Sequence, residues 1–166
     1  MTVLPYAAWD KPGKTTFYLH PENPGGCTLR KLTKYSAVEE VDLVRLEDIL
    51  PKEDISKIRL IKLDIEGAEY HALQGMTAIF DVNKDLKIIS EVNPQMLAEL
   101  STSTTKLFDF FESRGFYPYL INNNYSVEAY IASHVPRILP RLSVLPTNPS
   151  DIFFCRENLS STKICS

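Results

Sequence analysis

The chain has 166 residues, of which 44% are hydrophobic and 23% are charged, and its formal net charge is −3. This length and composition predict one globular domain, and the small negative charge argues against nucleic acid or an anionic membrane as a partner. No apolar run reaches the roughly 18 residues that would cross a membrane. Three cysteines without metal-ligand spacing, and a start without a signal-peptide pattern, favour a reduced, cytoplasmic location.

The first part of the chain predicts short strands joined by a turn and a loop. Residues 2–9 form an apolar strand, and Pro5 favours an edge position because proline cannot donate to a β-ladder. A Pro-Gly turn then leads into a returning strand at 15–19. Residues 20–27 contain two prolines and two glycines and predict a loop, after which the alternating pattern at 41–46 predicts another strand.

The two most apolar runs lie in the middle of the chain and predict its principal strands, at 60–65 and 86–92. Between them a short helix at 68–74 is expected to end at Gly75, a common residue after the last helical turn. Strands that alternate with helices at this spacing predict an α/β fold with a mainly parallel sheet, in which these two strands are adjacent and central. Right-handed crossovers would bring both carboxyl ends to the same edge.

The remaining chain continues the α/β pattern. We expect, in order, helices at 94–100 and 104–114, a strand at 116–121, a proline-rich loop at 135–149 and a last strand at 151–155. The domain would therefore span residues 1–156, and residues 157–166 would form a frayed tail.

Acidic residues follow both principal strands. Asp64 and Glu66 come after the first strand, and Glu91 ends the second. Ligands of open α/β sheets bind at the carboxyl ends of strands, so this acidic edge is the candidate functional site. Carboxylates also suit a hard cation such as Mg²⁺, but acidic strand ends are common without metal, and no metal is assigned.

Lys62 is unusual in a strand expected to be buried on both faces. A buried lysine needs a partner or a lowered pKa, and Glu91 on the neighbouring strand is the expected partner. The pair is either a structural ion pair or contains a lysine base that removes a proton from a hydroxyl group.

Asp64 also has two interpretations, as a group beside a reacting substrate or as a cap of the following helix. Glu66 and Glu69 flank Gly67 in the first helical turn, where the helix dipole alone would explain both acids. Gly67 is expected to adopt a backbone conformation that a side chain would obstruct.

The segments IKLDIEGAEYHALQGM and IISEVNP resemble the FkbM-type S-adenosylmethionine-dependent methyltransferases. The flanking segments PYAAWDKPGKTTFY, VDLVRLEDIL and DIFFCR also resemble that family, so the resemblance extends from about Leu4 to Arg156. The positions that match the central signature are Lys62, Asp64, Glu66, Gly67, Ala68, Glu69, Leu73, Gly75 and Glu91.

The resemblance implies a Rossmann-like fold and methyl transfer from S-adenosylmethionine to a small hydroxylated acceptor, such as a metabolite or a sugar. It implies that small residues at the end of the first strand let the flat adenine ring approach the backbone. The resulting site consists of catalytic Lys62, Asp64, Glu66 and Glu91 and cofactor-binding Tyr6, Ala7 and Ala8.

The family also binds its cofactor with a glycine-rich turn after its first strand, and no such turn occurs in this sequence. Gly25-Gly26 follows no apolar strand and opens no helix. The resemblance therefore implies a chain truncated at the N-terminus by two strands and two helices, weak cofactor binding, and an exposed sheet edge that favours self-association. The alternative function is a non-catalytic α/β remnant or pseudoenzyme that acts as an interaction module.

Overall fold

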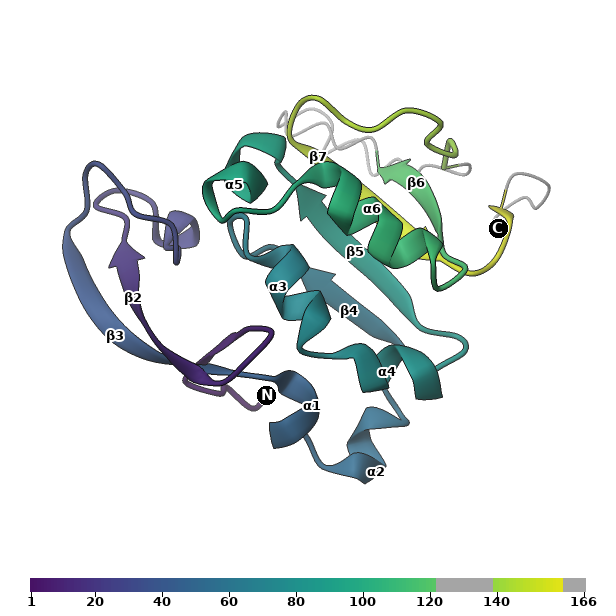
Figure 1. Cartoon of the computed structure of the whole chain (residues 1–166), viewed down its shortest axis with the longest axis horizontal. Coiled ribbons are helices and arrows are strands. Elements are labelled where there is room, and N and C mark those ends of the chain that lie inside the picture. Colours follow the sequence, from purple (N-terminus) through teal and green to yellow (C-terminus); the bar gives the residue numbers. More distant parts are fainter. Residues whose placement is uncertain (122–138, 160–166) are drawn as a thin grey trace.

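The computed structural model describes residues 1–121 and 139–159, which form two β-sheets and a layer of helices (Figure 1). The smaller sheet has the order β1-β3-β2 and the larger has the order β4-β5-β7-β6. The strands are β1 (Tyr6–Ala8), β2 (Gly13–Leu19), β3 (Ala37–Val44), β4 (Leu60–Leu63), β5 (Lys87–Val92), β6 (Tyr117–Ile121) and β7 (Ser150–Cys155).

Both sheets are mixed, so the expectation of a mainly parallel sheet is wrong. Among the described strands, β1 pairs with β3 and β4 with β5 in parallel, whereas the other three pairings are antiparallel. The antiparallel character of the larger sheet arises because β7 returns from late in the chain and inserts between β5 and β6. The predicted adjacency of β4 and β5 is confirmed, but β4 is an outer strand of the described sheet and not a central one.

The helices α3 and α6 lie over one face of the larger sheet (Figure 1). They follow strands in the βα order that the sequence predicts, although the short helix α2 was not expected. The helices are α1 (Leu46–Ile49), α2 (Lys52–Ile55), α3 (Glu69–Gln74), α4 (Thr77–Val82), α5 (Pro94–Glu99) and α6 (Thr104–Glu112), and a short 3₁₀ helix, η1, covers Pro24–Gly26.

Side-chain caps explain why two of these helices begin where they do. Asn93 accepts a hydrogen bond from the Met96 amide at 3.3 Å, and Pro94 occupies the first helical position, as predicted. Ser103 caps α6 in the same way, through the Lys106 amide at 3.2 Å. The predicted loop at 135–149 and the tail at 157–166 fall partly outside the described residues, and within the described part of the chain no helix is long and apolar enough to cross a membrane.

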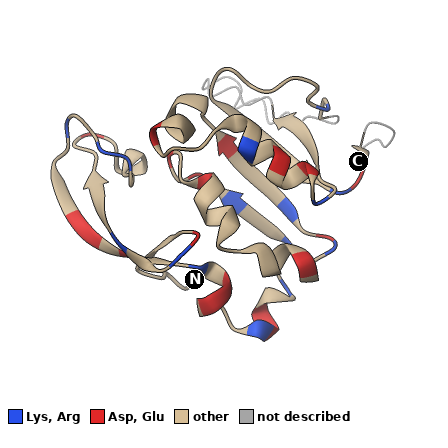
Figure 2. Ribbon diagram, viewed as in Figure 1, with Lys and Arg blue, Asp and Glu red and all other residues tan. Residues whose placement is uncertain are grey.

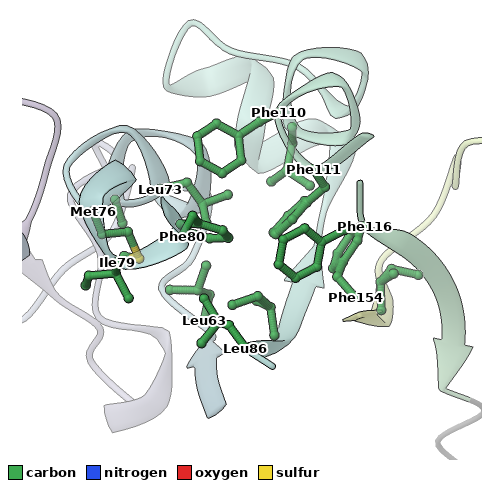
Figure 3. Packing of buried hydrophobic residues seen from close by; sticks show 14 of the residues in the cluster. Leu63, Leu73, Met76, Ile79, Phe80, Leu86, Phe110, Phe111, Phe116 and Phe154 are labelled. Carbon is green, nitrogen blue, oxygen red and sulfur yellow. The ribbon is translucent and has the colours of Figure 1, made fainter. Parts of the chain in front are cut away.

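Phenylalanine rings fill the space between the helices and the larger sheet (Figure 3). Phe111 of α6 stacks on Phe154 of β7 with ring centroids 3.8 Å apart, and Phe80 of α4 meets Phe110 edge to face at 5.2 Å. Each fully buried ring of this kind contributes about 1.5–3 kcal/mol to stability. The core therefore fixes β5 and β7 against α4 and α6, and leaves the carboxyl ends of β4 and β5 at its border.

The smaller sheet is joined to α3 by a close backbone contact at Gly75. A Cβ atom at this position would lie 1.8 Å from the Trp9 carbonyl oxygen, so no larger residue fits without a shift of the main chain. Beside it, the Trp9 and His71 rings stack with centroids 3.9 Å apart. Gly75 does follow the last turn of α3 as predicted, but its φ is −88°, so close approach and not left-handed geometry requires glycine.

We predict that Gly75→Ala lowers the free energy of unfolding by about 3 kcal/mol, because the added methyl group overlaps backbone atoms that cannot rotate away. Urea unfolding followed by circular dichroism measures the effect. Gly13→Ala is the matched control, since its Cβ would meet only the flexible Leu43 side chain at 3.8 Å. Equal effects of the two substitutions would contradict a special role for the contact between Trp9 and Gly75.

Candidate functional site

A strained turn follows β4 and places the predicted acids. Glu66 has a φ of +57° and Gly67 a φ of +98°, so two consecutive residues adopt positive φ. A Cβ at Gly67 would lie 2.6 Å from the Met96 carbonyl oxygen, which confirms that a side chain would obstruct this position. The turn redirects the chain from β4 into α3 immediately after Asp64.

Glu69 caps this turn from inside the protein. The residue is 1% exposed, and its Oε1 atom accepts hydrogen bonds from the Ile65 and Gly67 amides, both at 3.2 Å. Burial raises the pKa of the Glu69 carboxyl, and these amide donors oppose that rise. Glu69 therefore performs the capping that was one interpretation of Asp64, which leaves Asp64 available for another role.

Three carboxylates stand close together where β4 and β5 end and β7 begins. Glu91 of β5 is the register partner of Asp151 of β7, and Asp64 follows Leu63, the partner of Ser90. Figure 2 shows acidic residues at the corresponding end of β5 and at the start of α3. The sequence predicts a strand at 151–155 but not its partner or its direction in the sheet, so Asp151 was not among the predicted site residues.

The neighbouring carboxylates and burial change the pKa of Glu91. Burial, followed by the charges of Asp64, Glu66 and Asp151, raises the pKa of Glu91 to about 7. A carboxyl group with such a pKa exchanges its proton near neutral pH, which suits a general acid or base.

Lys62 differs from the prediction in its exposure and in its ion-pair partner. Its side chain is 61% exposed, and its Nζ atom lies 2.5 Å from Asp64 Oδ2, so the ion pair formed is with Asp64 and not the predicted one with Glu91. The expectation of a buried lysine failed because β4 is an outer strand, whose residues have access to solvent.

A cavity of about 700 Å³ connects the acidic edge with the smaller sheet. It brings together Asp64 and the predicted cofactor-binding residues Tyr6, Ala7 and Ala8, although they lie more than fifty positions apart in the sequence. Lys62, Glu66 and Glu91 are not among the residues that line it. A second cavity of about 510 Å³, between α6, β6 and residues 141–145, contains none of the predicted site residues.

The cavity is also lined by Cys27, Thr28 and Leu29 from the loop between β2 and β3. Arg30 fixes this loop, since its Nε atom donates to the Glu66 carbonyl oxygen at 2.8 Å. These residues were not among the predicted site residues, because the local pattern of a Pro- and Gly-rich loop does not indicate a contact 36 positions away. Within residues 1–121 and 139–159, no group of three or more His, Cys, Asp or Glu side chains is placed to hold a metal ion.

The chain is an α/β protein with a cavity at the carboxyl end of a parallel strand, the place where open α/β sheets bind their ligands. The family model described as the methyltransferase FkbM domain matches residues 2–118, and the chain therefore belongs to the FkbM methyltransferase family. The resemblance seen in the sequence is thus confirmed. Comparison with curated proteins and with solved structures gives no significant match.

We predict that Glu91→Gln removes a pH dependence of stability. Because the folded pKa of Glu91 lies above the value near 4.5 of an unperturbed glutamate, the folded state binds more protons than the unfolded state between these pH values. The stability of the wild type then falls as pH rises from about 4.5 to 7.5, and the variant should gain about 1 kcal/mol relative to it over this range, after allowance for solvent screening.

Urea unfolding of both proteins at pH 5 and pH 8 measures this difference. Glu53→Gln, a substitution at an exposed glutamate of α2, is the control and should show no relative change. If the free energies of unfolding of Glu91→Gln and the wild type differ by the same amount at pH 5 and pH 8, the raised pKa of Glu91 in the folded state would be contradicted.

Proposed function

We propose that this chain is an S-adenosylmethionine-dependent methyltransferase that methylates a hydroxyl oxygen of a small acceptor in the cavity beside Asp64. Membership of the FkbM family supports methyl transfer. The proposal places the reaction at this site because Asp64 lines the same cavity as Tyr6, Ala7 and Ala8.

The residues that line the cavity fit such a cofactor. A volume of about 700 Å³ falls in the range of small-molecule sites, and the small side chains of Ala7 and Ala8 leave room for a flat ring against the β1 backbone. The carboxylate of Asp64 complements a positive charge. S-adenosylmethionine, when bound, supplies an electrophilic methyl group on a positively charged sulfur atom.

The chain's own residues would orient the acceptor and receive its proton. Asp64 accepts a hydrogen bond from the acceptor hydroxyl, and Lys62, 2.5 Å away, fixes the orientation of this carboxylate. Glu91, with its pKa near 7, takes up the proton that the hydroxyl loses, through the neighbouring carboxylates. Lys62 is assigned orientation and not proton removal, because its ammonium group is already paired and exposed.

One element that the family resemblance implies is not found in the described part of the chain, namely a glycine-rich turn between a strand and a helix. Such turns hold cofactors through their backbone amides. We therefore expect this 166-residue chain to bind S-adenosylmethionine weakly, with saturation only at millimolar concentrations.

We predict that Asp64→Asn lowers the rate of methyl transfer by about 100-fold, whereas the affinity for S-adenosylmethionine changes by less than about threefold, because Asp64 acts on the acceptor side. Isothermal titration measures the affinity, and formation of S-adenosylhomocysteine with a panel of hydroxylated compounds measures transfer. Asp54→Asn, at an exposed ion pair with Lys57, is the matched control. Absence of saturable binding by the wild type at millimolar cofactor would refute the proposed enzyme.

A second candidate function, a non-catalytic interaction module, is favoured by the outer strand β4. Leu60 on this strand is 55% exposed, and within the described sheet β4 has a pairing partner on one side only. An outer strand with exposed apolar residues is a template for pairing with another strand. We propose a second copy of the chain as the partner.

Sedimentation velocity tests this pairing. If two β4 strands associate, Leu60→Lys should shift the protein from dimer towards monomer, because it places like charges along the shared edge. Val82→Lys replaces a residue of α4 that is similarly exposed, and should leave the distribution unchanged. A wild type that stays monomeric at about 100 μM, roughly the concentration at which weak pairs form, would exclude the module.

A further inference from the structure

The loop between β2 and β3 is longer than this connection requires. The two strands are antiparallel neighbours, a pair that two to five residues commonly join, whereas here the loop covers residues 20–36. The loop is ordered by its own contacts, which include an Asn23 side chain that accepts from the Gly25 amide at 3.0 Å and a bridge between Thr28 and Tyr18. Its Cys27–Leu29 segment forms one wall of the cavity.

Arg30 connects this wall to the acidic edge. Its side chain is only 10% exposed, and in addition to the hydrogen bond to the Glu66 carbonyl oxygen it forms ion pairs with Glu66 at 3.6 Å and with Glu99 of α5 at 2.5 Å. The Thr28 hydroxyl donates to the same Glu66 carbonyl oxygen at 3.3 Å. Two donors from the loop therefore converge on one carbonyl group of the strained turn.

The carbonyl group that Arg30 and Thr28 contact belongs to the turn that follows Asp64. Glu66 lies two residues after Asp64 and has a positive φ, a conformation that a non-glycine residue adopts only when its surroundings hold it there. The Arg30 guanidinium supplies charge-assisted hydrogen bonds to this residue and to a neighbouring helix, in a geometry that an ammonium group does not reproduce.

We propose that Arg30 is a positioning residue, which holds the Cys27–Leu29 wall against the Glu66 turn and so keeps the cavity closed on the side of Asp64. This inference rests on the proposed function in one respect, since the cavity is taken as the site of methyl transfer. Arg30 itself is not among the residues that line the cavity, and acts through Thr28 and Glu66.

The rate at which the Cys27 thiol reacts measures how often the Cys27–Leu29 wall moves away from the Glu66 turn. Alkylation by N-ethylmaleimide, quantified by peptide mass spectrometry, separates Cys27 from Cys155 and Cys165. We expect Arg30→Met to raise the Cys27 rate about tenfold, because the loss of charge-assisted hydrogen bonds shifts a local opening equilibrium by about that factor. Arg30→Lys should give a smaller rise, since lysine retains the positive charge but cannot donate to Glu66 and Glu99 from separate nitrogen atoms.

Arg156→Met is the matched control. Arg156 also donates to main-chain carbonyls, to Phe80 at 2.9 Å and to Asn83 at 2.6 Å, which lie in and directly after α4 and not in the loop between β2 and β3. Its substitution should lower the urea midpoint and leave the Cys27 rate unchanged. A Cys27 rate in Arg30→Met equal to that of the wild type, or a rise matched by Arg156→Met, overturns the positioning role.

Millimolar S-adenosylmethionine separates this inference from the proposed function. In the wild type the cofactor should slow Cys27 alkylation, and in Arg30→Met this protection should be weaker. Failure of the cofactor to protect the wild type would contradict the proposed function, while the comparison between the Arg30 variants in the absence of cofactor would still decide whether Arg30 holds the wall.

Discussion

The close contact between the Trp9 carbonyl and Gly75 joins the smaller sheet to the helices that cover the larger sheet. It sets the distance between the smaller sheet and α3, because no side chain fits between these two stretches of backbone. The cavity has one wall from each side of this joint, with Ala7 and Ala8 on the smaller sheet and Asp64 at the end of β4. A single small residue that does not itself line the cavity thus sets the spacing between the elements that form its walls.

The acidic edge contains features that lower the stability of the folded state. The carboxylates of Asp64, Glu91 and Asp151 repel one another, and Glu66 has a backbone conformation that is unfavourable for its residue type. Proteins tolerate such features where the surrounding structure holds them, and they gather at functional sites. Here Glu69 and Arg30 hold the turn, one from the interior and one from the β2–β3 loop. A bound group with positive charge would relieve the repulsion.

The parts of the fold that could be predicted from the sequence are those set by neighbours in the chain. The adjacency of β4 and β5 follows from two apolar runs joined by one short crossover, the start of α5 from Asn93-Pro94, and the need for Gly67 from its place among acids at a strand end. These features depend on local spacing and on backbone conformation, which a sequence displays directly.

The features that could not be predicted depend on where distant segments meet. The exposure of Lys62 follows from the outer position of β4, which no local pattern reveals. Asp151 reaches the acidic edge only because β7 runs antiparallel to β5, and Arg30 reaches Glu66 across 36 positions of the chain. The resemblance predicts a Rossmann-like fold, which stays a prediction, whereas the residues that line the cavity could be identified only in the three-dimensional structure.

Trp9 is the only tryptophan of the chain, and it stacks on His71 at the joint between the smaller sheet and α3. The tryptophan fluorescence of this protein, excited at a wavelength that its eight tyrosines do not absorb, is therefore a signal from the joint and not from the phenylalanine core. Its emission would follow the docking of the two sheets, while far-ultraviolet circular dichroism follows their secondary structure. A heat or denaturant transition that appears earlier by fluorescence than by dichroism would mean that the smaller sheet separates before the larger one melts.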